Sequence, residues 1–153
     1  MQAEWINLDK FNFRETLRHT GIWPARRIIY SVHSNGLMFK DANGVLYSTH
    51  DADGYSDGGT IPWPFCLWMR RTEYMESYWF HDQGCQFGGF WENVETKQGI
   101  KRQKWVEFDR PYLDKMLERM IEASPNDRKI KSELIYAGAT IGGWFGIGKK
   151  EKQ

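Results

Sequence analysis

The N-terminal third of the chain carries the hydrophobic pattern of β-strands. The segment Arg27 to His33 is rich in β-branched and aromatic residues, and the turn residues Ser34 to Gly36 follow it directly. A second apolar run, Leu37 to Phe39, leads towards Asn43-Gly44, a strong hairpin signal, and Val45 to Thr49 then returns. These runs predict a small antiparallel β-meander on the N-terminal side of the fold.

Two segments beside this meander have no regular period. Trp5 to Leu17 matches neither the helical nor the strand spacing of apolar residues. Asp51 to Pro64 contains three Asp, three Gly and two Pro, so it is predicted to be a loop.

After this loop the pattern becomes helical. Arg71 to Asp82 contains neither Gly nor Pro, and Gly84 is expected to end the helix. Asp109 as N-cap and Pro111 in the first turn predict the start of a second helix. Arg128 to about Gly148 is predicted as a third helix. The second helix has an apolar stripe at helical spacing, formed by Leu113, Met116, Leu117, Met120 and Ile121.

These elements predict an α+β fold in one domain, residues 1–153, in which the small meander is followed by three main helices. The last of them is uncharged from Leu134 to Gly148. Those fifteen residues, five of them Gly, fall short of the ~20 apolar residues that a membrane-spanning helix requires. No transmembrane span is therefore predicted, and a buried core helix is favoured.

Composition adds an excess of aromatic residues to this picture. Nine Phe, eight Trp and seven Tyr make up 16% of the chain, and rings of this size need a core or a partner surface to cover them. The formal net charge is only +1, so no nucleic-acid partner is indicated. Cys66 and Cys85 lack the spacing of a zinc or redox motif, and the sequence leaves their pairing open.

Polar residues from three separate elements form the candidate site. Asp57 lies between Ser56 and two glycines, where backbone can approach a ligand closely. His81 and Asp82 are adjacent in the first predicted helix, and Asp114 stands at the edge of the apolar stripe of the second. Because a His-Asp pair suits a hard or borderline metal, Asp57, His81 and Asp82 are predicted to bind a divalent ion. His81, Asp82 and Asp114 are the predicted catalytic residues.

The sequence does not favour a serine or cysteine nucleophile. The chain has no Gly-x-Ser-x-Gly elbow. Cys85 follows His81 by four positions, but such a pair needs a continuous helix, and Gly84 is expected to interrupt it.

Four segments stand in an order that points to a family. They are Gly54 to Pro62 (Gly-Tyr-Ser-Asp-Gly-Gly-Thr-Ile-Pro), His81-Asp82 inside a helix, Asp114 early in the next helix, and Tyr136 to Gly148. In this order they resemble a bacteriophage and prophage group, the domain-of-unknown-function family 1353. The resemblance covers about residues 28–148. It implies a phage origin and an α+β fold, and it brings no assured activity.

The chain departs from the family pattern after the His-Asp pair. It carries Gln83-Gly84-Cys85 where an aromatic or aliphatic residue followed by Tyr is usual. It also has a longer insert, Gln86 to Lys104, which is expected to add a lid or a contact surface.

Two hypotheses on function follow. The first is a metal-dependent hydrolase that acts on cell-wall peptidoglycan during phage entry or lysis, or on a host nucleotide. The second is a non-enzymatic virion protein, associated with the tail or capsid, in which Asp57, His81 and Asp82 form a buried hydrogen-bond network. Its partner surface would be aromatic: Trp63, Phe65, Trp68, Trp79, Phe87, Phe90 and Trp91. Without a secretory signal, synthesis is expected in the host cytoplasm, with a later place in the virion.

Overall fold

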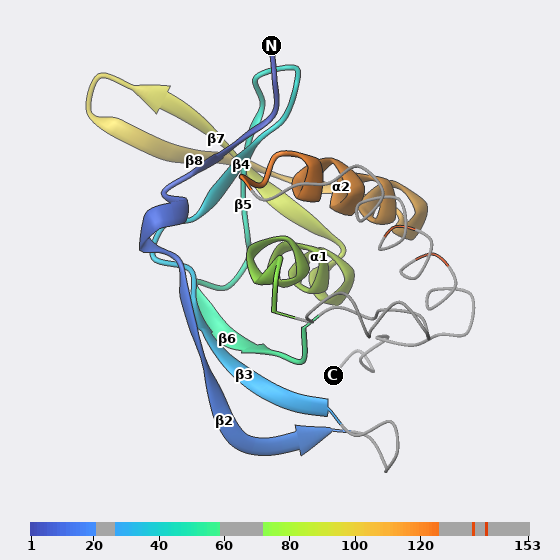
Figure 1. Cartoon of the computed structure of the whole chain (residues 1–153). Helices are drawn as coiled ribbons and strands as arrows, with labels where there is room; N and C mark the ends of the chain where they lie inside the picture. The colour runs from blue at the N-terminus through green and yellow to red at the C-terminus, as the bar shows by residue number, and fades with distance from the viewer. Residues whose placement is uncertain (21–26, 59–71, 126–135, 137–139, 141–153) are drawn as a thin grey trace.

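Two antiparallel β-sheets and two α-helices build the described part of the chain (Figure 1). The computed structural model describes residues 1–20, 27–58, 72–125, 136 and 140. Helix α1 (Met75–Phe87) is the central element, because it contacts strands of both sheets and also packs against helix α2 (Arg110–Glu122). The candidate site therefore lies on an element that is held from several sides.

The larger sheet has five strands in the order β1-β4-β5-β7-β8, and every neighbouring pair is antiparallel. Its last two strands form a long hairpin that extends away from the body of the molecule (Figure 1). The strands are β1 (Glu4–Ile6), β4 (Met38–Lys40), β5 (Leu46–Ser48), β7 (Gly89–Thr96) and β8 (Gly99–Glu107).

The smaller sheet has three strands in the order β2-β3-β6. They are β2 (Asn12–Thr20), β3 (Arg27–His33) and β6 (Asp53–Ser56), and a short 3-10 helix, η1 (Leu8–Lys10), precedes β2. Strand β6 lies against α1, where a Trp79 ring carbon is 2.7 Å from the position that a side-chain carbon on Gly54 would take. This close approach explains why glycine stands in the middle of the strand.

One strand and one hairpin of the predicted meander are confirmed, but the three apolar runs do not form one meander, because β3 lies in the smaller sheet and β4 and β5 lie in the larger one. Strand β3 has the predicted bounds, Arg27–His33. The Asn43-Gly44 turn joins β4 to β5: Asp41 Oδ1 accepts the amides of Asn43 and Val45, each at 2.9 Å, and Gly44 has φ +83°. Local sequence was informative here because a turn of this kind is specified by residues within it.

The chain is α+β overall, but the prediction of a small meander followed by three main helices is wrong. The described residues form eight strands and two α-helices. The additional strands come from the region of residues 5–17, which fitted neither period, from the predicted loop, and from the insert with the residues that follow it, to which no secondary structure was assigned. Each gains its hydrogen bonds by pairing with a neighbouring strand, which a local pattern does not reveal. The predicted third helix, residues 128–148, lies outside the described residues.

Helix α2 is confirmed with its cap. The side chain of Asp109 accepts the amide of Tyr112 at 3.0 Å, and Pro111 lies in the first turn. The five apolar residues of the predicted stripe are all buried. Neither helix in the described ranges is long and apolar enough to cross a membrane.

Helix α1 does not end at Gly84, as the sequence suggested. It continues to Phe87, and its cap is Gly88, whose φ of +79° is the left-handed conformation in which many helices end. Gly84 is instead a packing residue. A side-chain carbon there would lie 2.7 Å from the ring of Phe90 and 2.8 Å from Leu113.

Substituting Gly84 is therefore expected to destabilise the protein. Alanine would gain about 1 kcal/mol of helix propensity, but overpacking costs about 1–3 kcal/mol, so we expect a net loss near 1 kcal/mol. Gly84→Val adds volume and a β-branch and should lose more. Urea unfolding of the two variants and the wild type measures the order of their stabilities. A Gly84→Ala protein more stable than the wild type would contradict this packing.

The aromatic excess is divided between the core and the surface. Among the rings predicted as a partner surface, Trp79 and Phe90 are buried in the core, whereas Phe87 and Trp91 are half-buried. The other three, Trp63, Phe65 and Trp68, lie outside the described residues. A single exposed aromatic surface made of all these residues is therefore excluded by the burial of the first two.

Candidate active site

His81 and Asp114 meet between the two helices. His81 projects from the middle of α1, and Asp114 projects from the second turn of α2. His81 Nε2 and Asp114 Oδ1 are 2.7 Å apart, and the two side chains are only 9% and 4% exposed. Asp114 had been placed at the edge of the apolar stripe of its helix, and the structure buries it in the contact between the helices.

A second cation, Arg110, shares this carboxylate. Its Nε donates to Asp114 Oδ1 at 2.9 Å from one turn earlier on α2. The Arg110 side chain is 29% exposed, so its guanidinium lies between the buried pair and the surface. Because an unpaired buried carboxylate is costly, the arginine helps to keep Asp114 ionised.

The pKa values of His81 and Asp114 are shifted in opposite directions by their neighbouring side chains. Burial by itself disfavours both charges, but the hydrogen bond to Asp114, with a contribution from Cys85, outweighs it and raises the pKa of His81 to about 9. In the same way, His81 and Arg110 overcome the burial of Asp114 and lower the pKa of its carboxyl. At neutral pH the pair is therefore an imidazolium and a carboxylate.

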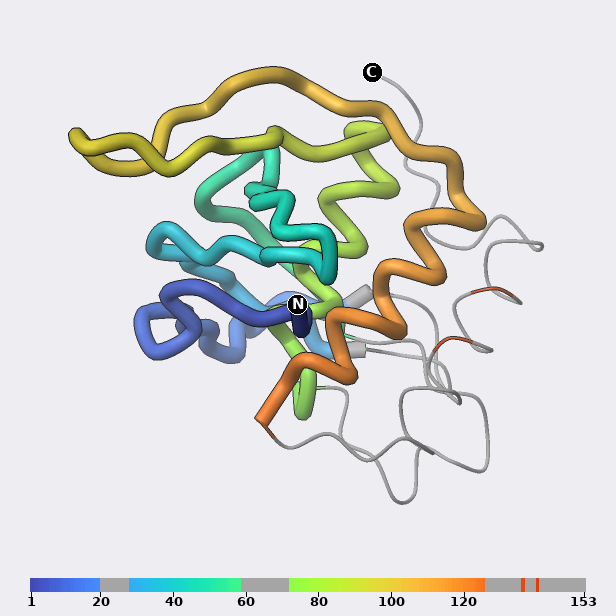
Figure 2. Tube along the Cα trace, turned by 90° about the horizontal axis from the view of Figure 1, so that it is seen from above, coloured from blue at the N-terminus to red at the C-terminus, as the bar shows by residue number. Residues whose placement is uncertain are grey.

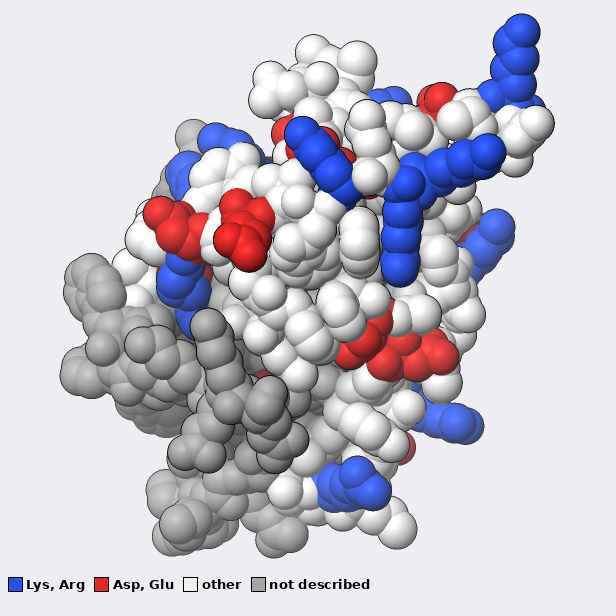
Figure 3. All heavy atoms as spheres, turned by 180° about the vertical axis from the view of Figure 1, so that it is seen from behind, with Lys and Arg blue, Asp and Glu red and all other residues white. Residues whose placement is uncertain are grey.

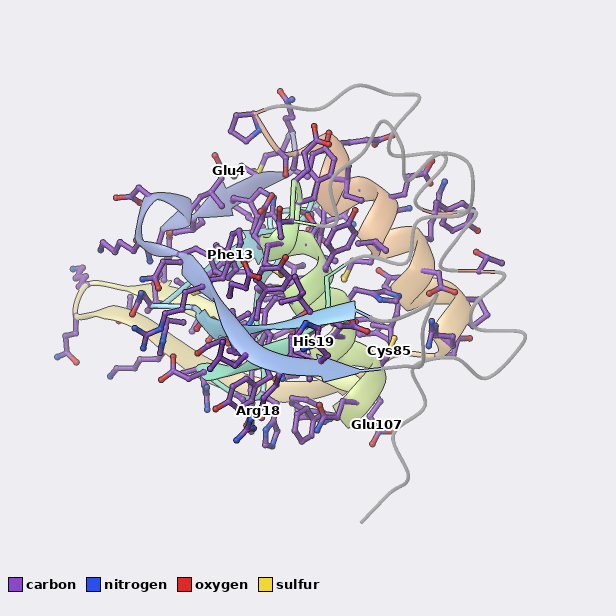
Figure 4. The ribbon with its side chains drawn as sticks, turned by 60° about the horizontal axis from the view of Figure 1, so that its bottom comes forward. Glu4, Phe13, Arg18, His19, Cys85 and Glu107 are labelled. Carbon is purple, nitrogen blue, oxygen red and sulfur yellow. The ribbon has the colours of Figure 1, made fainter. Side chains whose placement is uncertain are left out.

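Cys85 completes a row of three functional side chains. It lies one turn after His81 on α1, and its Sγ is 3.6 Å from Nε2 and 3.9 Å from Nδ1 of the imidazole. It is half-buried and carries a free thiol. Figure 4, in which Cys85 is labelled, views the molecule from the side of the smaller sheet. The sequence argued against this pair only because Gly84 was expected to end the helix, and that expectation was wrong.

Asp82 belongs to a different contact. Its Oδ2 accepts the hydroxyl of Ser56 at 2.9 Å, at the end of β6. The same Ser56 oxygen accepts the amide of Gly58 at 3.1 Å, so the half-buried Asp57 lies beside this contact in the chain. The neighbouring Gln83 ties α1 to a second segment, because its Oε1 accepts the amide of Asp51 at 2.9 Å.

The predicted site residues thus fall into two groups. His81 and Asp114 are joined directly between the helices, whereas Asp82 is joined to Ser56 between α1 and β6. Consecutive helical residues point about 100° apart, which accounts for the separation of His81 from Asp82. Asp57 belongs to the chain segment of the second group.

The donors expected for a metal ion are engaged with other groups. Nε2 of His81 bonds to Asp114, and Asp114 also bonds to the cation Arg110, which would repel a metal ion at that oxygen. Within the described ranges, no three His, Cys, Asp or Glu side chains are grouped so as to hold a metal. The divalent ion stays a prediction from the sequence.

Of the two further residues at this site, Cys85 was considered from the sequence and rejected, and Arg110 was missed, although both carried a signal. Cys85 stands four positions after His81, and Arg110 stands four positions before Asp114, which is the spacing of neighbours on one helix face. What the spacing alone did not reveal is that these two faces meet each other.

Comparisons with known proteins add nothing to this geometry: no family model, no curated protein and no solved structure matches the chain.

Proposed function

We propose that the protein is a hydrolase in which Cys85 is the nucleophile, His81 its acid and base, and Asp114 the group that orients His81. The observation that supports this is the unbroken contact from Asp114 through His81 to the sulfur of Cys85. A nucleophile next to a base that is itself held by a third group is the common arrangement of covalent catalysis. Arg110 steadies the carboxylate from the side nearer the surface.

In the proposed reaction the Cys85 thiolate forms a bond with the carbonyl carbon of an amide. The carbon–nitrogen bond breaks, and the imidazolium of His81 gives its proton to the leaving nitrogen. Water then attacks the thioester and gives one proton to the neutral imidazole of His81, so the carbon–sulfur bond breaks and the Cys85 thiolate and the imidazolium are restored. The product is a carboxylic acid, whose proton passes to the released amine. Asp114 keeps the imidazole in position through Nε2, and the sulfur lies 3.6 Å from that nitrogen and 3.9 Å from Nδ1. In this proposal the proton exchange with sulfur uses Nδ1, the nitrogen that does not contact Asp114.

The proposed substrate is the peptide part of peptidoglycan, cleaved during phage entry or lysis. This choice rests on the resemblance to the phage and prophage family, and amide bonds are abundant in cell-wall peptides. The thiolate is the form of a cysteine that attacks such bonds.

Replacing Cys85 by alanine tests the proposal. We expect the rate at which purified peptidoglycan releases new amino groups to fall at least about a hundredfold, because the covalent step is lost. The melting temperature should stay close to that of the wild type, because the change removes one half-buried sulfur. Cys66→Ala, at the other cysteine of the chain, is the control. A Cys85→Ala protein as active as the wild type would disprove the nucleophile.

The second candidate is a virion or accessory protein without catalysis. The contact from Asp82 through Ser56 to the amide of Gly58 favours it, because this contact fixes β6 and the following segment to α1. If the protein is of this second kind, the wild type releases no amino groups from peptidoglycan. Substitutions at the His81–Asp114 contact or at the Asp82–Ser56 contact then change only the stability of the protein.

A further inference from the structure

A row of aromatic side chains leads away from the candidate site along the larger sheet. Phe87, in the last turn of α1, stacks on His50, with ring centroids 3.9 Å apart and planes inclined by 13°. His50 in turn meets the ring of Trp105 edge to face at 5.7 Å and 89°. Phe87 stands only two residues after Cys85, so the row begins next to the proposed nucleophile in the chain.

The row continues onto the hairpin of β7 and β8. Trp91 and Trp105 are opposite each other in the pairing of the two strands, and their rings are 5.4 Å apart at 74°. The guanidinium of Arg102 lies 5.4 Å from the centre of the Trp91 ring. Aromatic rings and one cation therefore form a continuous surface from α1 to the hairpin.

The hairpin part of this surface, Trp91 and Trp105, is on the face of the sheet opposite the buried Phe90. Side chains alternate along a strand, and Phe90, next to Trp91, points into the core, where it is fully buried. Trp91 and Trp105 are half-buried, while His50 and Arg102 are exposed. In Figure 2 the hairpin runs along one side of the molecule with α1 and α2 on its inner side, and no described segment is drawn outside it.

The charge of the hairpin helps to identify the ligand. Residues 89–107 carry four Lys and Arg against three Glu, and Lys104 is paired with Glu92 at 3.2 Å. Basic side chains stand out at this end of the molecule in Figure 3, and acidic groups lie beside them. A nucleic acid needs several uncompensated cations for its phosphates, and this hairpin has a surplus of only one. The aromatic row suits a ligand of sugar rings better, because their apolar faces pack on aromatic faces without a charge requirement.

We propose that the row from Phe87 to Arg102 binds a glycan strand of hexopyranose units, and that the hairpin is the substrate-holding part of the protein. The glycan would stack on Trp91 and Trp105, and Arg102 would donate hydrogen bonds to its oxygens. This inference rests on the proposed function for the choice of cell-wall glycan, and it gives the insert of residues 86–104 a role as a contact surface.

We call the aromatic row from Phe87 to Arg102 the platform. Binding of the Cys85→Ala protein to purified, insoluble peptidoglycan tests it, because this variant is not expected to cleave the glycan-bound peptide. Trp91→Ala and Arg102→Gln are expected to weaken sedimentation with the glycan at least about tenfold, as loss of central contacts does. Tyr55→Ala is the matched control, because Tyr55 is an exposed ring, 54% accessible, with a cation, Arg18, over it on the smaller sheet. Arg102→Gln changes an exposed side chain, so it keeps the test valid if Trp91→Ala does not fold.

Three results would overturn the platform. They are binding of Arg102→Gln and Trp91→Ala as strong as that of the parent, equal weakening by Tyr55→Ala, or preferential binding of oligo-thymidine over glycan. The two proposals fail separately. If Cys85→Ala binds glycan through Trp91 but the wild type cleaves nothing, only the hydrolase is wrong. If the wild type cleaves cell-wall peptide without glycan affinity, only the platform is wrong.

Discussion

Replacing Asp114 by alanine is expected to lower the free energy of unfolding by about 3–5 kcal/mol, the usual cost of breaking a buried ion pair. The variant keeps His81 at 9% exposure and removes the carboxylate 2.7 Å away that stabilises its charge. Arg110 loses the partner of its Nε at the same time. Urea unfolding near pH 6, where the imidazole of the wild type is protonated, measures the loss.

The chain supplies a matched control for this experiment. His33 and Asp53 form the same kind of pair at 3.3 Å, but the two side chains are 36% and 65% exposed. Exposed pairs contribute at most about 1 kcal/mol, so Asp53→Ala should change stability little. Asp114→Asn preserves the shape of the side chain and one acceptor oxygen. Its loss of stability should therefore lie between the losses of Asp114→Ala and Asp53→Ala. Equal losses for Asp114→Ala and Asp53→Ala would show that the pair between the helices does not stabilise the fold.

The parts of the fold that could be predicted are those specified by nearby residues. Asp109 and Pro111 marked the start of α2, and Asn43-Gly44 marked the turn between β4 and β5. The parts that were missed depend on distant partners. Strand β6 lies in a segment rich in Asp and Gly, and it is a strand because β3 supplies its hydrogen bonds.

Gly84 shows the same limit within a helix. As a sequence signal, a glycine near the end of a helical pattern is typical of a stop. Here α2 and β7 approach α1 so closely that Leu113 and Phe90 leave no room for a side chain. The true stop is Gly88, four residues later, and this displacement is what kept Cys85 out of the predicted site.

The sequence predicted several residues of the candidate site, but it did not predict how they are arranged. His81 and Asp114 were both named, and they lie in contact. The adjacency of His81 and Asp82 suggested a shared role, but neighbouring positions on a helix face different parts of the fold, and Asp82 bonds to Ser56. Cys85 contributes to the raised pKa of His81, and Arg110 contributes to the lowered pKa of Asp114. The contact between His81 and Asp114 became visible only with the packing of α1 on α2.

Stability is also expected to depend on pH through His81. Its pKa is about 9 in the folded protein, against 6.5 for an ordinary histidine. Since the folded state holds the proton more tightly, the stabilisation is fully present below pH 6.5 and is lost as the pH rises through 9. The whole step corresponds to up to about 3 kcal/mol. On the acid side, the lowered pKa of Asp114 means that its stabilisation is present above pH 3.8 and is lost as the pH falls further.

Urea unfolding from pH 5 to pH 9.5 tests this dependence, and Asp114→Asn identifies its source. The hydrogen bond to the Asp114 carboxylate is the main contribution that raises the pKa of His81, so the variant should lose most of the decline between pH 6.5 and 9. Other groups that titrate in this range are present in both proteins and cancel in the difference between the two curves. Parallel curves for the wild type and Asp114→Asn would mean that His81 is not held as an imidazolium by Asp114. The proposed acid of the hydrolase would then lack the proton that it must give to the leaving nitrogen.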